Sequence, residues 1–154
     1  MRPGGLSSTP SIERQRRIED AGRDRMKSFL YTVDTTKSFE AAVEAVERRV
    51  AEKNFRVVHT YDVAATPAER RFPRGPVKII EVCNPRYAGE VLENDPNVES
   101  LLTCPIAVYT ERGKTFIGTL RPSALTALCP RAGPAGIAIA VEEVVLQIVN
   151  AARA

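Results

Sequence analysis

The sequence predicts a single α+β domain, in which a mostly antiparallel sheet of about five strands carries helices on one face. Three observations predict this class. Strand-like and helical runs alternate without a regular β-α-β repeat, two strands form a hairpin near residue 112, and the chain ends in a strongly apolar helix. At 154 residues and 44% hydrophobic content, the chain is long enough to bury the core of one domain.

The N-terminal residues 1–25 are predicted to be a disordered or loosely helical tail. They are rich in Gly, Pro, Ser, Arg and acidic residues, and only Ile12 and Ile18 offer an apolar anchor. The folded domain is therefore expected over residues 26–154. Met26 opens a strand-like run, and it is a candidate natural start of the protein in place of Met1.

The first strand is expected at residues 29–34 and the clearest helix at 37–54. In that helix the apolar residues recur at spacings of four, three and four, which is one face of a helix. They are Phe39, Val43, Val46 and Val50. Ser38 is the expected N-cap and Asn54 the expected end.

Two further strands and a short helix follow. Period-two alternation over residues 55–63 places Phe55, Val57, His59, Tyr61 and Val63 on one face of a second strand. Residues 66–72 are expected to form a short polar helix or turn, and residues 77–83 the third strand. The helix at 84–95 begins with Pro85, which suits a first turn.

The last third of the chain predicts a hairpin and two helices. The hairpin covers residues 104–120 around Glu111-Arg112-Gly113-Lys114, a short helix covers 121–129, and the apolar helix covers 137–154. The resulting order is β-α-β-β-α-β-β-α-α. A sheet with one open face often dimerises through that face or an edge, so a homodimer is expected.

Charge and composition limit the classes of partner that this protein is expected to bind. The net charge is +3, and the first 25 residues account for +2 of it, so the folded part lacks the strong basic stripe typical of nucleic-acid binding. No apolar run is long enough to span a bilayer. Three irregularly spaced cysteines form no disulfide framework. We therefore expect a cytoplasmic protein with reduced thiols that binds neither nucleic acid nor membrane.

Several blocks of the sequence resemble the DUF302 family, a domain of unknown function. These blocks are SFEAAVEAVERRVAEKNFRVVHTYDV, VKIIEVCNPRYAGEVLENDP and CPIAVYTERGKTFIGTLRPSAL, which match in order over roughly residues 26–152. The resemblance implies a TATA-binding-protein-like α+β fold and a homodimer, without implying DNA binding. The long tail and Asn54, where the family tends to have Gly, depart from the family pattern.

Cys83 and Cys104 are the leading candidates for a functional site. Cys83 ends a strand just before Asn84-Pro85, Cys104 lies just before Pro105, and both match positions where the family tends to keep Cys. If the two strands are antiparallel neighbours, the thiols are close enough to act as a nucleophile, a redox pair or a two-coordinate copper(I) site. The alternative is that both pack as small apolar groups, as is expected of Cys129.

Four further residues are candidates. His59, the single His, is a possible general base, and strand parity allows a Glu81–His59–Cys83 cluster. Arg121, beside a helix start at Pro122, is a possible anion ligand, and Tyr109 is placed near the same cleft by position alone. A half-buried His with a hydrogen-bonded neighbour and an Arg paired with a surface carboxylate are the competing interpretations.

The sequence offers two principal functions. No zinc-ligand pattern, phosphate-binding loop or serine nucleophile elbow is present, so no metal site is assigned and no cofactor is identified. The favoured function is a homodimeric binding module for a small ligand or soft metal near Cys83, Asn84 and Cys104. The alternative is a thiol-dependent enzyme or redox protein that uses Cys83 with Cys104, and a purely structural partner is a third possibility.

Overall fold

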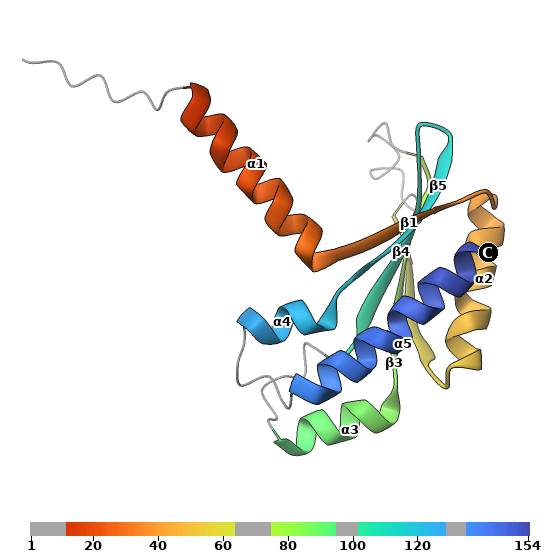
Figure 1. The fold of residues 1–154 in the computed structure, drawn as a ribbon. Helices are drawn as coiled ribbons and strands as arrows, with labels where there is room; N and C mark the ends of the chain where they lie inside the picture. Colours follow the sequence, from red (N-terminus) through yellow and green to blue (C-terminus); the bar gives the residue numbers. More distant parts are fainter. Residues whose placement is uncertain (1–11, 64–74, 95–101, 129–134) are drawn as a thin grey trace, which may run out of the picture.

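The computed structural model describes residues 12–63, 75–94, 102–128 and 135–154. Figure 1 shows one sheet with helices over one side of it. The elements in chain order are α1 (Ile12–Phe29), β1 (Leu30–Thr35), α2 (Phe39–Glu52), β2 (Arg56–Asp62), β3 (Val77–Cys83), α3 (Pro85–Asn94), β4 (Cys104–Glu111), β5 (Lys114–Leu120), α4 (Pro122–Leu128) and α5 (Ala135–Arg153). Residues 66–72 and Cys129, for which the sequence makes predictions, lie outside the described residues.

The five strands form one antiparallel sheet in the order β1-β5-β4-β3-β2. The predicted α+β class, with an antiparallel sheet of five strands and helices on one face, is confirmed. β4 and β5 form the predicted hairpin, whose two-residue loop has Arg112 at φ 51° and Gly113 at φ 76°. Two successive positive φ values are typical of a type I′ turn, whose twist matches the strands that it joins.

The core lies between the sheet and the helices α2 and α5. Alternation along the strands sends every second side chain into this layer. Ile80, Ile106, Val108 and Ile117 are fully buried there, against Val46 of α2 and Ile148 of α5 among others. We call this side of the sheet the covered face and the opposite side the open face.

The ends of α2 agree with the sequence analysis. The Ser38 side chain accepts a hydrogen bond from the backbone N–H of Ala41 at 3.2 Å, which satisfies one of the free donors of the first turn. Asn54 follows the helix at φ 58°. Asn tolerates this left-handed conformation better than most residues, so it replaces Gly there at little cost.

The N-terminal segment differs in part from the expectation. Residues 12–29 form the helix α1, which runs through Met26, so β1 begins at Leu30 and not at the predicted residue 29. Ile12 and Ile18 are 74% and 64% exposed, so neither anchors this helix. Figure 1 shows α1 projecting away from the sheet and its covering helices.

Candidate functional site

The site lies where β3 ends and α3 begins. β3 and β4 are antiparallel neighbours, as the thiol hypothesis required, and their register pairs Val82 with Cys104. Cys83 is the last residue of β3, and after Asn84 the chain enters α3 at Pro85. The strand end therefore brings the two cysteines and Asn84 to one region of the molecule.

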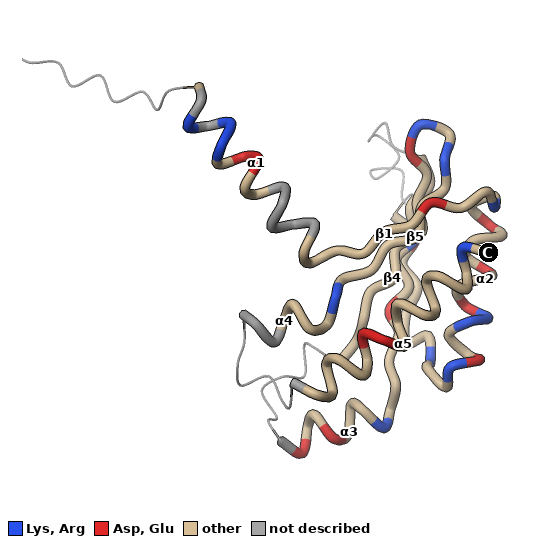
Figure 2. The backbone as a smooth tube through the Cα atoms, in the orientation of Figure 1, with Lys and Arg blue, Asp and Glu red and all other residues tan. Residues whose placement is uncertain are grey.

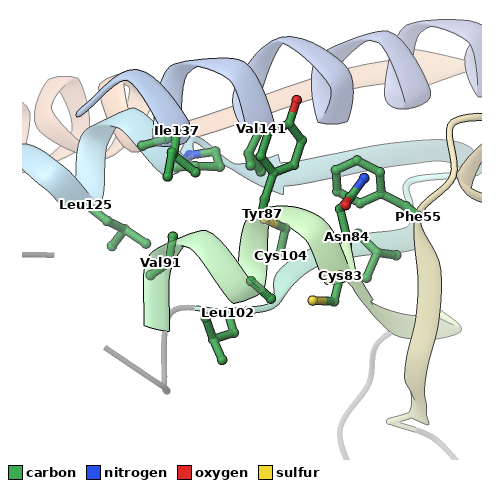
Figure 3. Close-up of a pocket in the computed structure, with 14 residues that line it drawn as sticks. Phe55, Cys83, Asn84, Tyr87, Val91, Leu102, Cys104, Leu125, Ile137 and Val141 are labelled. Carbon is green, nitrogen blue, oxygen red and sulfur yellow. The ribbon is translucent and has the colours of Figure 1, made fainter. Parts of the chain in front are cut away.

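A pocket occupies this region between the sheet, α3, α4 and α5. Figure 3 shows Ile137 and Val141 of α5 on one side, Tyr87 and Val91 of α3 facing them, and Leu125 and Phe55 toward the two ends. We call this space the apolar pocket. Its lining consists of Phe55, Val82, Cys83, Asn84, Tyr87, Ala88, Val91, Leu102, Cys104, Pro122, Leu125, Ile137, Ala138 and Val141.

The apolar pocket is small and carries few polar groups. Its cavity volume is about 70 Å³, and no residue in its described lining is charged at neutral pH. The polar contribution comes from the Asn84 amide, the Tyr87 hydroxyl and the two thiols. A concave apolar site with a few polar groups is the usual form of a small-molecule site.

The two thiols face different environments. Cys104 is buried on the covered face with its register partner Val82, whereas Cys83 is half-buried and shares the strand parity of Glu81. Burial raises the pKa of the Cys104 thiol to about 12, helped by the nearby Cys83 and Glu81, and burial also raises the pKa of Cys83. Raised pKa values keep both groups protonated at neutral pH, which disfavours a thiolate nucleophile or metal ligand.

Asn84 fixes the junction. Its Oδ1 accepts a hydrogen bond from the backbone N–H of Arg86 at 3.0 Å, and its Nδ2 donates to the Asn54 carbonyl at 3.4 Å. The first bond satisfies a free donor in the first turn of α3. The second ties this turn to the loop after α2, so the Asn84 side chain holds one wall of the pocket in place.

The Arg121 guanidinium forms an ion pair with a carboxylate of the same chain. Its NH1 lies 3.1 Å from Glu142 Oε1, and the Ser123 backbone N–H donates to Glu142 Oε2 at 3.0 Å. The Ser123 hydroxyl also bonds to Glu142. Burial raises the pKa of Glu142, but the bonds from Ser123 and Arg121 outweigh it and leave that pKa lowered. Arg121 therefore pairs with a carboxylate of its own chain, which agrees with the competing interpretation of this residue and not with a site for an anionic ligand.

His59 does not share a face with Phe55, so that prediction was wrong. Val57 pairs with Val82 but His59 pairs with Glu81, which makes Val58 an extra residue in β2. Such a bulge reverses the alternation after it. His59 and Tyr61 consequently lie on the open face opposite Glu81 and Ile79, on the other side of the sheet from the apolar pocket.

The remaining candidates separate from the pocket as well. Tyr109 lies on the open face, where its ring stacks on Phe116 with centroids 5.3 Å apart. His59 and Glu81 are register partners and share the parity of Cys83, but within the described ranges no group of three His, Cys, Asp or Glu is placed to hold a metal ion. None of the described helices is both long and apolar enough to cross a membrane.

The sequence analysis missed most of the pocket lining. Val91, Leu125, Ile137 and Val141 come from three helices, and only the apolar character of the last helix was visible beforehand. Apolar spacing indicates which helix face is buried, but not where three buried faces leave a gap. The sequence analysis also did not single out the basic residues Lys53, Arg56 and Arg86, because Arg86 is far in sequence from the other two.

The fold and the site define a small α+β domain with an apolar pocket at the edge of its helical layer. The chain belongs to the family described as domain of unknown function DUF302, whose profile matches residues 31–152. The crystal structure of an uncharacterized conserved DUF302 protein from Bacillus stearothermophilus is similar, with a TM-score of 0.73 and 30% sequence identity. That match covers 81% of this chain and 98% of the other. No curated protein is similar to the chain.

Proposed function

We propose that this protein is a homodimeric binding module that holds a small, mostly apolar ligand in the apolar pocket near Cys83 and Cys104. The observation that carries the proposal is the pocket itself. Its described lining has no charged side chain, and its walls come from the sheet and three helices. Such a site gains affinity by removing apolar ligand surface from water and gains specificity from its few polar groups.

The proposal favours an organic ligand over a soft metal. A copper(I) site needs thiolates, and the pKa values of both thiols are raised. The same property weighs against the alternative of a thiol-dependent enzyme or redox protein, since attack on a disulfide requires a thiolate. Cys83 and Cys104 then contribute to the site as polarisable, mostly apolar groups.

The open face of the sheet supports the homodimer. Strand register places apolar and aromatic side chains there, and the described helices pack on the other face. These residues include Leu30, Val77, Ile79, Ala107, Tyr109, Phe116 and Leu120. Charges of both signs flank them at Glu111 and Lys114. A second copy of the chain matches this pattern, because a two-fold interface must be self-complementary.

Two measurements test the proposal. We expect hexan-1-ol, titrated against the reduced protein and followed by NMR, to bind saturably and shift the signals of Val91, Leu125 and Val141. The Ala138→Phe variant fills the pocket and should abolish this binding. The matched variant Ile139→Phe adds the same ring at a neighbouring position that is 53% exposed, and should retain it.

Binding that is absent in the native protein, or unchanged by Ala138→Phe, would contradict the pocket as the site. Native mass spectrometry under reducing conditions without chelator tests the assembly. A dimer is expected, with bound ligand appearing as mass that is lost on denaturation. A monomer at micromolar concentration would contradict the homodimer.

A further inference from the structure

A second, polar cavity opens beside the apolar pocket. Its volume is about 570 Å³, and we call it the basic cleft because three of its residues are cationic: Lys53, Arg56 and Arg86. None of the described residues that line it is acidic. The complete lining is Lys53, Asn54, Phe55, Arg56, Asn84, Pro85, Arg86, Tyr87 and Val144. Figure 2 shows basic segments at the end of α2 and the start of α3 at the same end of the molecule.

The backbone brings these cations together from two places in the chain. Asn54 turns the chain at φ 58°, so that Lys53 and Arg56 flank the turn between α2 and β2. The Asn84 side chain bonds both to the Asn54 carbonyl and to the Arg86 N–H. The cation of α3 is thereby held beside the cations of the turn.

The cations keep free hydrogen-bonding capacity. Lys53 Nζ donates to the neutral Gln147 Oε1 at 2.9 Å, and Arg86 Nε pairs with Glu90 at 3.2 Å while its side chain is 84% exposed. An exposed ion pair four residues apart on a helix is weak, so it yields readily to another anion. Arginine binds carboxylate and phosphate oxygens through several N–H groups at once.

The apolar pocket and the basic cleft adjoin each other. Phe55, Asn84 and Tyr87 line both of them. One molecule can therefore occupy the apolar pocket and extend past these three residues into the basic cleft. Because the first cavity lacks charge and the second is positive, a ligand that matches both has an apolar tail and an anionic head.

We propose that the ligand is an anionic amphiphile whose short apolar tail fills the apolar pocket while its carboxylate or phosphate head lies among Lys53, Arg56 and Arg86. This inference rests on the proposed function. One water molecule, which is about as large as one heavy atom of a ligand, needs about 10–15 Å³ of cavity volume. The apolar pocket of about 70 Å³ therefore accommodates a tail of about five heavy atoms. Hexanoate and hexyl phosphate are suitable probes.

The test compares ligands that share a six-carbon tail and differ in their head group. Hexanoate, hexyl phosphate, hexan-1-ol and hexylamine are titrated against the full chain by NMR at low and high salt. We expect at least one anion to bind about tenfold more tightly than the alcohol, and hexylamine to bind more weakly than the alcohol. The preference should shrink at high salt, which screens the charges. The anion that binds more tightly identifies the head group.

Variants separate this inference from the proposed function. Arg56→Gln combined with Arg86→Gln should remove the preference for the anion and leave hexan-1-ol binding unchanged. Arg48→Gln, an exposed arginine of α2 outside the cleft lining, should keep the preference. Equal binding of alcohol and anions, or a preference that survives the double variant, would overturn the inference alone. Absence of binding by all four probes would overturn the proposed function with it.

Discussion

The two faces of the sheet are built from the same strands but have different surroundings. On the covered face Ile80 and Ile106 are fully buried under α2 and α5, and the apolar pocket lies at one end of this layer. On the open face Ile79 and Ala107, their sequence neighbours and each other's register partners, are half-buried beside Tyr109. Successive residues of β3 or β4 therefore place their side chains on opposite faces of the sheet.

The difference shows how burial divides the roles of neighbouring residues. A fully buried side chain on the covered face contributes to stability through both its transfer from water and its close packing. A half-buried side chain on the open face contributes less in the isolated chain, and the rest of its surface is available to a second copy. Stability and assembly should therefore respond separately to substitutions on the two faces.

The largest contrast is expected between Ile106→Ala and Ile79→Ala. Ile106 is fully buried, so its truncation leaves a cavity and should lower the free energy of unfolding by about 3 kcal/mol. Ile79 is only half-buried, so its truncation should cost about 1 kcal/mol in dilute protein. Urea unfolding followed by circular dichroism measures both.

Protein concentration sharpens this comparison. If a second copy covers the open face, the cost of Ile79→Ala should increase with protein concentration, since dimer formation stabilises the folded state by mass action. The cost of Ile106→Ala should change little. Equal costs for the two variants at low concentration would contradict the distinction between the faces.

An intermediate effect is expected at Glu142, which holds α4 against α5 on the helical side. Glu142→Gln weakens the bonds to Arg121 and Ser123, and should lower the free energy of unfolding by about 1–2 kcal/mol at pH 7. The pKa of Glu142 is lowered in the folded protein. Its contribution is therefore fully present above the unfolded pKa of about 4.3, and it is lost as the pH falls through the lower folded pKa.

Urea unfolding of the native protein and the variant at pH 7, 5 and 3 measures this dependence. The difference between them should persist at pH 5 and decrease toward pH 3. Lys37→Gln, a change of one charge elsewhere on the surface, is the control and should give no such profile. A difference that is constant down to pH 3 would contradict the carboxylate's role in holding α4.

The smallest effect on stability is expected at Cys83, although the two thiols should differ clearly in their reactivity. Native-state alkylation by N-ethylmaleimide should modify the half-buried Cys83 and spare the buried Cys104. The Cys83 rate should rise beyond the pH at which a free thiol levels off, because burial raises its pKa. Peptide mass mapping after timed labelling separates the cysteines.

Substitution of Cys83 by Ser should then change the free energy of unfolding by less than about 0.5 kcal/mol, the usual range for a substitution away from the core. Cys104→Ser places a hydroxyl in an apolar environment and should cost about 1–3 kcal/mol. Equal labelling of both thiols in the folded protein would show that Cys104 is accessible, and would revive the redox alternative.

Local sequence signals were sufficient for most of the fold. The spacing of Phe39, Val43, Val46 and Val50 with a Ser cap located α2, and Arg112-Gly113 located the hairpin turn, because both depend on residues within a few positions of each other. The junction at Cys83 and Asn84 was predicted as a candidate site for the same reason. Two local inferences failed, since the bulge at Val58 moved His59 to the open face and the helix α1 runs through Met26, where a strand was expected to open.

By itself, the sequence determined the α+β class, the helix and strand order after residue 30, and the position of the two thiols at adjoining strand ends. Only the tertiary structure decided that Glu142 forms an ion pair with Arg121 and that three helices line the apolar pocket. It also decided that Lys53, Arg56 and Arg86 meet beside this pocket. The physical reason is the separation along the chain over which each effect acts. Periodicity and turn chemistry act between near neighbours, whereas cavities and charge clusters arise where distant segments pack together.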